Sequence, residues 1–525
     1  MILHVAKKEV LEHIKSFRFS LAFLFIVLTF FVMLFMRHVD YRAKFDDYQL
    51  RVRAQELSLD KFAHYNRING LIIPILPPAP MEIIVEPAVT SSVMESGRSL
   101  DDNPFDATKI PLDMIAIVGL LGSLLALLLS YDSINREIHE GTIRLLLSSG
   151  VPRIKIIIGK ILGGSLAAVL PVTVIFLLAS LWLAITGGLG WGVNLWISFM
   201  GIFLVSLIYI VFFYCLGAFL SSVILDQTLS ALSCFGIWVV FVIVVPVISP
   251  YIAGAAIKVP DSGQMQRQID HIYNVERDDA IRKIIMPLIA QGLSFEDAWD
   301  KTNAAELNRT FQDRVDALQK EFRNASIRQS KLSIHLACVS PYSLYLASVE
   351  ELSGLGFERF QHIENVISNW GQNAREYVEH QHNEARRRDT AYTIDSKLDV
   401  PDMPRFQYVE LGLSYKYSNA LPYILLLLSF FIIPLFLYLN AFITKKALLR
   451  LSFVLIFVCA FDYNLLSGGG NYCKPLRSVC SLHLQSLAGF RNLLIVGELR
   501  QNLLQSGAAC HSVDLQNQRF CKSTG

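Results

Sequence analysis

Charged residues are scarce in this chain of 525 residues. Asp, Glu, Lys and Arg make up 18% of it, whereas soluble proteins carry about 25%. Apolar residues reach 53%, and the mean hydropathy is +0.42. The 47 basic and 45 acidic residues leave a net charge of +2, which excludes the strongly basic surface that nucleic-acid binding requires. The composition predicts an integral membrane protein with polar domains attached.

The motifs of common enzyme classes are also absent. The chain contains no H-E-x-x-H zinc motif and no G-x-S-x-G nucleophile motif. Gly159-Lys160 resembles the end of a phosphate-binding loop, but Ile154 stands where that loop needs a glycine. Ile161 likewise replaces the Ser or Thr that would bind the metal. We therefore expect no enzyme activity, no cofactor and no metal.

Long stretches without charge mark the membrane-spanning segments. Between 161 and 257 the only charged residue is Asp226, and about 20 apolar residues suffice for one crossing. This stretch holds three crossings, and three isolated apolar stretches supply the others. The expected spans are 19–36, 113–131, 161–186, 194–220, 229–250 and 417–444. We predict an all-α membrane protein with six transmembrane helices, whose spans lack the ionisable groups of an ion-coupled transporter.

Lysine and arginine cluster on one side of these spans, and such residues mark the cytoplasmic side of a membrane protein. The clusters lie within 1–18, within 132–160 and directly after 444, whereas the turn 187–193 has none. With six spans, both termini are cytoplasmic. The segments 37–112 and 251–416 then lie outside a cell membrane, which we expect to be a bacterial inner membrane.

The two outer segments differ in pattern. The first is polar and then contains Pro74-Ile-Leu-Pro77-Pro78-Ala-Pro80, a composition typical of an extended spacer. In the second, apolar residues recur at helical spacing from Leu307 to Ala325 and from Phe357 to Trp370. We predict an extracytoplasmic helical domain inserted between helices 5 and 6. Its apolar faces form either the core of that domain or a coiled-coil interface with a partner protein.

Two further regions have an unusual composition. The nearly uncharged run 333–349 is expected to lie against the membrane surface. Five of the eight cysteines follow Val458, without the paired C-x₂-C spacing of a zinc module. We expect 445–525 to be a poorly ordered cytoplasmic tail.

The cytoplasmic loop 132–160 is too long for a simple turn. Charged and apolar residues alternate along it, and Gly141-Thr142 suits the end of one short helix and the cap of the next. One interpretation is an amphipathic elbow at the membrane surface. The other is a short helix that is presented to a soluble partner.

This loop resembles the first cytoplasmic loop of type-2 ABC exporter permeases. The motif is Glu137-x-x-x-Gly141-Thr142-x-x-Leu145-Leu146-Leu147-Ser148, followed by Arg153 and by Gly159-Lys160. More narrowly, it is similar to the branch that includes the nitrous-oxide-reductase maturation permease and the gliding-motility permease. The stretch 6–21 resembles the amphipathic interface helix of that family, and the long insertion before Ser340-Pro341 resembles a subgroup with an enlarged loop between helices 5 and 6.

The resemblance implies a permease subunit that pairs with a second permease subunit, as a homodimer or heterodimer, and with a dimer of separate ABC ATPase subunits. The implied ATPase-coupling interface is Glu137, Glu140, Gly141, Thr142, Arg144 and Arg153. By analogy, the two carboxylates face basic groups of the ATPase, and the helix 1–18 lies along the inner membrane surface. The alternative is a non-transporting membrane scaffold or sensor whose extracytoplasmic helical domain binds a partner protein.

Overall fold

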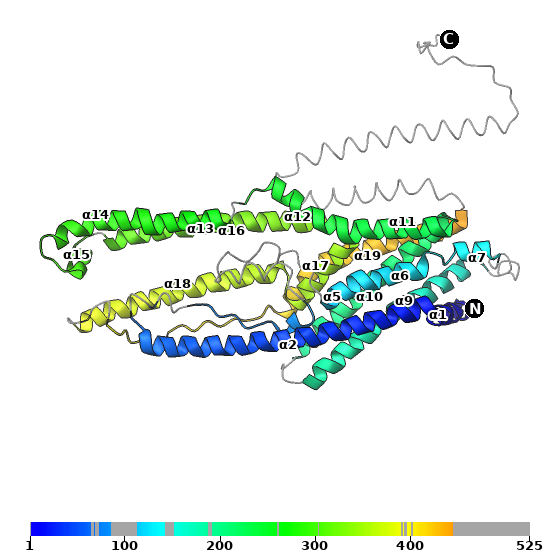
Figure 1. Cartoon of the computed structure of the whole chain (residues 1–525), viewed down its shortest axis with the longest axis horizontal. Coiled ribbons are helices and arrows are strands. Elements are labelled where there is room, and N and C mark those ends of the chain that lie inside the picture. Colours follow the sequence, from blue (N-terminus) through cyan, green and yellow to red (C-terminus); the bar gives the residue numbers. More distant parts are fainter. Residues whose placement is uncertain are drawn as a thin grey trace, which may run out of the picture. The chain divides into compact units, whose positions relative to one another are not determined.

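The computed structural model describes residues 2–64, 68, 73–85, 113–141, 152–186, 192–259, 262–302, 304–389, 392, 396–400 and 403–444. Residues 1–445 form one compact unit, and the predicted tail 445–525 lies outside the described residues. The elements in chain order (Figure 1) are α1 (Ile2–Ile14), α2 (Phe17–Phe62), η1 (Pro80–Ile83), α5 (Met114–Ala116), η4 (Ile117–Gly122), α6 (Ser123–Ser130), α7 (Asn135–His139), α9 (Arg153–Thr186), α10 (Val193–Val223), α11 (Gln227–Val239), η5 (Val240–Val244), α12 (Val245–Ala256), α13 (Ser262–His271), η6 (Ile272–Arg277), α14 (Asp278–Ile289), α15 (Phe295–Lys301), α16 (Ala304–Ala337), α17 (Pro341–Ser353), α18 (Phe357–Arg388) and α19 (Leu413–Thr444).

Among the described residues, six helical stretches are long and apolar enough to cross a membrane. They are Phe17–Leu59, Met114–His139, Ile154–Thr186, Val193–Val223, Gln227–Ala256 and Leu413–Phe436. The all-α fold with six candidate spans is therefore confirmed. Apart from one isolated bridge between His64 and Lys397, the regular structure of the described residues is helical throughout.

Helix α10 is the centre of the bundle, in contact with α6, α9, α17 and α19. Its residues are apolar on every side, which is typical of a helix that is surrounded by others. Tyr209, Phe213 and Tyr214 on this helix are almost completely buried. The ring of Tyr209 stacks on that of Tyr345 in α17, with centroids 4.5 Å apart. The core of the bundle thus forms around aromatic side chains of α10.

Helix α17 lies inside this bundle. Pro341 follows the N-cap Ser340, whose Oγ accepts hydrogen bonds from the backbone N–H groups of Tyr342 and Ser343 at 3.1 and 3.2 Å. Gly354, at φ +75°, ends the helix in the left-handed conformation that glycine adopts readily. Four hydrophobic residues of this helix are 1% exposed or less: Leu344, Tyr345, Val349 and Leu352. The sequence predicts that 333–349 lies against the membrane surface, whereas the structure shows that the apolar side chains of α17 pack against other helices.

Two π-helical segments, η4 and η5, lie where α17 packs. In η4, the carbonyl of Gly119 accepts a hydrogen bond from the Tyr209 hydroxyl at 2.9 Å. In η5, the carbonyl of Phe241 accepts a hydrogen bond from Ser340 Oγ. Backbone carbonyl groups in the π segments of two spans therefore accept hydrogen bonds from hydroxyl groups of neighbouring elements. Such π segments are frequent at functional sites.

Helix α2 continues far beyond its apolar part. It has 46 residues, and at 1.5 Å per residue it is about 69 Å long. It contains no glycine or proline, and the ion pairs Lys44–Asp40 and Arg51–Asp47 support its polar half at (i, i+4) spacing. The first part of the segment 37–112, expected to be a polar outer loop, is thus helical up to Phe62.

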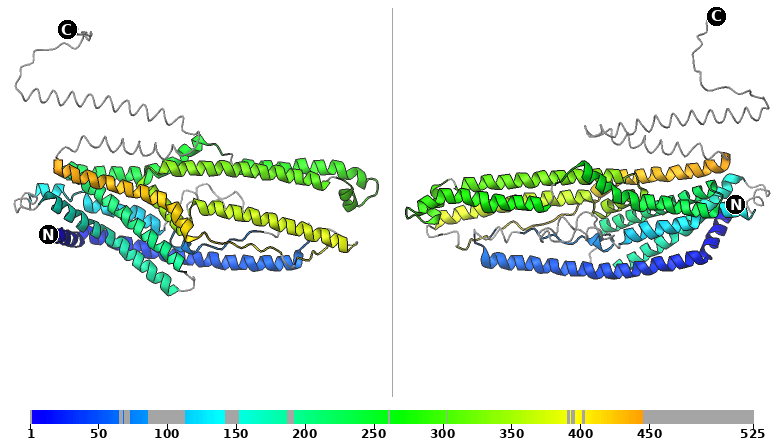
Figure 2. Two further views of the ribbon diagram at one scale, coloured as in Figure 1. Left: turned by 180° about the vertical axis from the view of Figure 1, so that it is seen from behind. Right: turned by 45° about the horizontal axis from the view of Figure 1, so that its top comes forward.

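The end of the molecule away from α1 and α7 forms what we call the distal domain: the polar half of α2, the helices α13 to α16, α18, and the segments 396–400 and 403–412 (Figures 1 and 2). The predicted amphipathic helices are α16 and α18. Phe311 and Val315 of α16 pack against Ile269 and Ile272 of the preceding helices. These apolar residues of α16 therefore form an internal core, as the first of the two interpretations proposed.

We predict that Gly119→Ala destabilises the bundle. A Cβ at this position would overlap the buried ring of Tyr342, and overpacking of a core costs about 1–3 kcal/mol. The melting temperature of the purified protein should fall. The control is Gly236→Ala in α11, where a Cβ has no neighbour within 4 Å, so this variant should melt at the wild-type temperature or above it. Equal melting of both variants would contradict the packing of α17 against η4.

Candidate functional site

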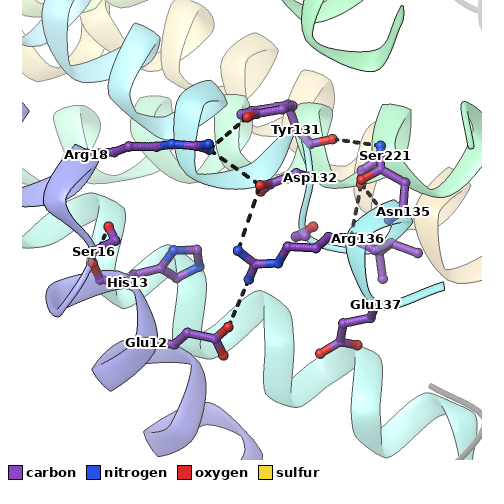
Figure 3. Close-up of polar contacts among 12 residues, drawn as sticks. Glu12, His13, Ser16, Arg18, Tyr131, Asp132, Asn135, Arg136, Glu137 and Ser221 are labelled. Carbon is purple, nitrogen blue, oxygen red and sulfur yellow. Dashed lines mark hydrogen bonds and ion pairs between the residues drawn. The ribbon is translucent and has the colours of Figure 1, made fainter. Parts of the chain in front are cut away.

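The short helix α7 is the last part of the second helical stretch, Met114–His139, and its first turn is bonded to neighbouring residues (Figure 3). The hydroxyl oxygen of Ser221, near the end of α10, accepts hydrogen bonds from the backbone N–H groups of Ile134 and Asn135 at 3.0 and 3.2 Å. The fully buried Asn135 side chain donates to the carbonyls of Tyr131 and Ile224. The first turn of α7 is therefore bonded to the end of the fourth span.

Helix α1 packs along the first turns of α9. Its buried face consists of Ala6, Glu9 and His13. Gly163 of α9 permits this approach, because a Cβ there would overlap the Ala6 carbonyl and the Glu9 side chain. Small residues allow helix backbones to come this close.

A buried ammonium group joins three elements at this place. Lys160 Nζ of α9 lies 3.1 Å from both carboxylate oxygens of Glu9 in α1 and 3.0 Å from Glu137 Oε1 in α7. It also donates to the carbonyl of Ser133 at 3.2 Å. The Lys160 side chain is only 5% exposed. We call Lys160, Glu9 and Glu137 the buried clamp.

The ionisation of Glu9 reflects this environment. Burial opposes the charged form of its carboxyl group, but the His13 imidazole, 3.6 Å away, and the charge of Lys160 outweigh burial and lower the pKa below its ordinary value of 4.5. A carboxyl group whose pKa is lowered by folding stabilises the fold above its ordinary pKa. The contribution of Glu9 is thus complete at neutral pH and is lost as the pH falls below 4.5.

A second and more exposed set of polar contacts also connects these elements (Figure 3). Arg136 of α7 pairs with Glu12 of α1 at 2.9 Å. Arg18, at the start of α2, donates to the Tyr131 hydroxyl at 2.8 Å and lies 3.6 Å from Asp132. Exposed pairs of this kind contribute about 0–1 kcal/mol each. Their number and positions nevertheless tie α1, α2 and α7 to one another on the outside as well.

The described residues at this site serve packing and anchoring. Within the part of the chain that the structure describes, no group of three or more His, Cys, Asp or Glu side chains could hold a metal ion. The site is a helix end that is firmly anchored and exposed at its tip, which suits the transmission of force to or from another protein.

The comparisons with known proteins decide the family. The family model described as "ABC-2 family transporter protein" matches residues 3–446. This chain belongs to that family. It is therefore a multi-pass membrane protein and the permease component of an ABC transporter. A search of curated proteins finds no match.

In this permease, the predicted interface residues have different positions. Glu140 is exposed, and Gly141 has φ +71°, with no atom within 4 Å of the place that a Cβ would occupy. Glu137 is buried, and Lys160 binds its carboxylate inside the chain. This corrects the expectation that Glu137 faces a basic group of a partner.

The remaining predicted residues of the permease are less fully defined. Thr142 and Arg144 lie outside the described residues, and Arg153 is the first residue of α9. Neither Glu9 nor Lys160 was predicted from the sequence to be a site residue. Their opposite charges lie on two segments that were predicted to meet near the membrane surface. This was the feature of the sequence that could have indicated their pairing.

We predict that Lys160→Met releases α1 from the permease. Two buried carboxylates would lose their counter-ion, and breaking a buried ion pair in this way costs about 3–5 kcal/mol. Hydrogen exchange of the backbone amides in 2–14 should become faster, and the melting temperature should fall. The control is Lys155→Met, an exposed lysine on the same helix. Unchanged exchange in Lys160→Met would show that the clamp does not hold α1.

Proposed function

We propose that this chain is the permease subunit of an ABC-type exporter and that a separate ATPase drives it through α7. The observation that carries the proposal is the exposed end of α7. Ile138, which is 41% exposed, and the neighbouring His139 and Glu140 face solvent, whereas Asn135 and Glu137 behind them are buried. An exposed apolar residue beside a charged one on a fixed support suits a groove in a partner protein.

In this proposal, the ATPase moves the bundle through the anchored base of α7. A displacement of the tip passes to α10 through Ser221 and to α1 and α9 through Lys160. Closure of the ATPase dimer on ATP must favour one arrangement of these helices, because coupling between two sites is a difference in free energy between two states. The clamp makes α1, α7 and α9 respond together.

The proposed assembly contains two permease subunits and two ATPase subunits. In the most apolar stretch of the fifth span, Gln227–Ala256, only 17% of the residues are buried inside the chain. Its remaining surface is available to lipid and to a second permease subunit, which is either a copy of this chain or a related one. The narrower resemblance to nitrous-oxide-reductase maturation and gliding-motility permeases remains a prediction.

We further propose that α1, α7 and both termini are cytoplasmic in a bacterial inner membrane, and that the distal domain is extracytoplasmic. The basic residues Lys7 and Lys8 are exposed on α1, and Lys15 is exposed directly after it, as the positive-inside rule requires for the cytoplasmic side. This end also carries the candidate ATPase contact.

The orientation predicts the labelling of single cysteines on intact cells. An impermeant thiol reagent should label Thr310→Cys in α16 and should not label Glu140→Cys at the end of α7, although both positions are exposed. Permeabilised cells should label both, which controls for reactivity. Labelling of Glu140→Cys on intact cells would reverse the proposed topology.

The partner contact predicts a loss of affinity in Glu140→Arg. We expect weaker assembly with the ATPase by less than about 1 kcal/mol for an exposed contact, and by about 1–3 kcal/mol for a desolvated, hydrogen-bonded one. The measurement is titration of the purified permease with its ATPase. The control is Glu321→Arg, an exposed residue of α16 in the distal domain. Wild-type affinity in both Glu140→Arg and Ile138→Asp would leave the membrane-surface elbow as the better interpretation.

The scaffold or sensor alternative makes the opposite prediction for these two regions. Its supporting observation is that the distal domain contains apolar cores of its own. A scaffold would keep its function when α7 no longer binds an ATPase, and would lose it when the distal domain is altered. The same α7 variants therefore separate the two functions.

A further inference from the structure

The distal domain consists of two arms with separate cores. Arm one comprises α13 to α16, and its core lies between α13, η6 and α16. Arm two comprises the polar half of α2, α18 and the segments 396–400 and 403–410, and its core contains Ala63, Val378 and Leu398. Within the described ranges, no cluster of buried apolar residues has members from both arms.

Each arm is the continuation of a different span. Arm one follows the fifth span, Gln227–Ala256, after the short connection 257–261, and its helix α16 packs back onto α12, the last part of that span. Arm two contains the polar half of α2, and the apolar half of the same continuous helix is the first span. The arms are otherwise joined at their base through α17, between the end of α16 and the start of α18.

Three ion pairs connect the facing helices of the two arms. They are Lys331–Glu358 at 3.8 Å, Arg323–Glu364 at 3.1 Å and Arg309–Glu379 at 3.3 Å. The basic residue lies on α16 and the acidic residue on α18 in every pair, and the pairs are spaced along both helices from base to tip. Near the base, the ammonium of Lys331 also lies 5.6 Å from the centre of the Phe357 ring.

These contacts are exposed, above all toward the tips. The side chains of Arg309 and Glu379 are 71% and 49% exposed. Water and salt weaken the attraction between such charges, since the Debye length is about 10 Å at 0.1 M salt. The tips can therefore separate without the exposure of a shared apolar core.

The length of α2 amplifies any tilt of the first span. The part of α2 after residue 40 is about 33 Å long at 1.5 Å per residue, so a tilt of about 10° displaces its end by about 6 Å. The tips of the two arms would thus move much further apart than the spans that carry them.

We propose that the α16–α18 ion pairs form a clasp, and that the clasp opens and closes as the first and fifth spans tilt relative to each other. The clasp itself depends only on the contacts described above. Its link to the transport cycle rests on the proposed function, because a nucleotide-driven ATPase must move the spans.

The first test measures the distance between the arms in the full-length chain. Spin labels on a keto amino acid at positions 313 and 380 report the distance between α16 and α18, and this chemistry leaves the native cysteines unmodified. Asp313 and His380 are both exposed. Labels at 57 and 380 report the distance within arm two, where Leu57 is also exposed.

We expect Glu379→Arg to lengthen and broaden the distance between the arms, because it faces Arg309. The distance within arm two should stay the same. The exchange Arg309→Glu with Glu379→Arg should restore the original distance, and the control Glu376→Arg, at an exposed position on the same helix, should not change it. An unchanged distance in Glu379→Arg would overturn the clasp, as would a change that the exchange does not reverse.

The second test uses the chain assembled with its ATPase, without nucleotide and trapped with ATP and vanadate. The distance between the arms should differ between these states, whereas the distance within arm two should not. Equal distances, in a complex that binds and hydrolyses ATP, would overturn the link to the transport cycle. Failure to assemble with any ATPase would instead refute the proposed function, and the charge-reversal test would still decide whether the clasp exists.

Discussion

A single buried ammonium group holds together the end of the molecule that carries the candidate interface. Lys160 lies within 3.1 Å of carboxylate oxygens from Glu9 and Glu137, which belong to two other elements. Each carboxylate would be costly to bury without this counter-ion. The clamp therefore places α1 and α7 on α9 at defined positions, and the exposed tip of α7 owes its orientation to it.

The bundle behind the clamp combines apolar packing with a few buried hydroxyl groups. Helix α17 is inserted among the spans, where Tyr345 stacks on Tyr209 and its hydroxyl lies 3.1 Å from Ser206 Oγ. Because α17 also connects the two arms of the distal domain, a rearrangement of the spans would move both the distal domain and the end of the molecule that carries α7. The proposed clasp and the proposed coupling site would then respond to the same movement of the bundle.

The sequence predicts the parts of the fold that follow from local patterns. Uncharged runs identify the six spans, and helical periodicity identifies α16 and α18. The polar half of α2 was not predicted, since the charges after Arg37 suit a loop as well as a helix, although this stretch lacks glycine and proline. The position of α17 was not predicted either, because an uncharged helix suits contact with lipid as well as contact with other helices.

The interface assigned to this loop remains a prediction. In the structure, Glu140 is exposed and Gly141 half-buried at the end of α7. Glu137 was assigned to the partner by analogy with the family, whereas in the structure Lys160 binds its carboxylate within the chain. The pairing of Lys160 with Glu9 joins residues that are 151 positions apart. No local pattern reveals such a contact, which depends on how α1 folds back onto α9.

The most direct test is a photocrosslinking amino acid at position 140 of the permease in its native membrane, compared with position 321 in the distal domain. If α7 couples the permease to an ATPase, position 140 should crosslink to a protein that contains a phosphate-binding loop, and position 321 should not. Crosslinks from position 140 to lipid alone, or to proteins without a nucleotide-binding motif, would contradict the account.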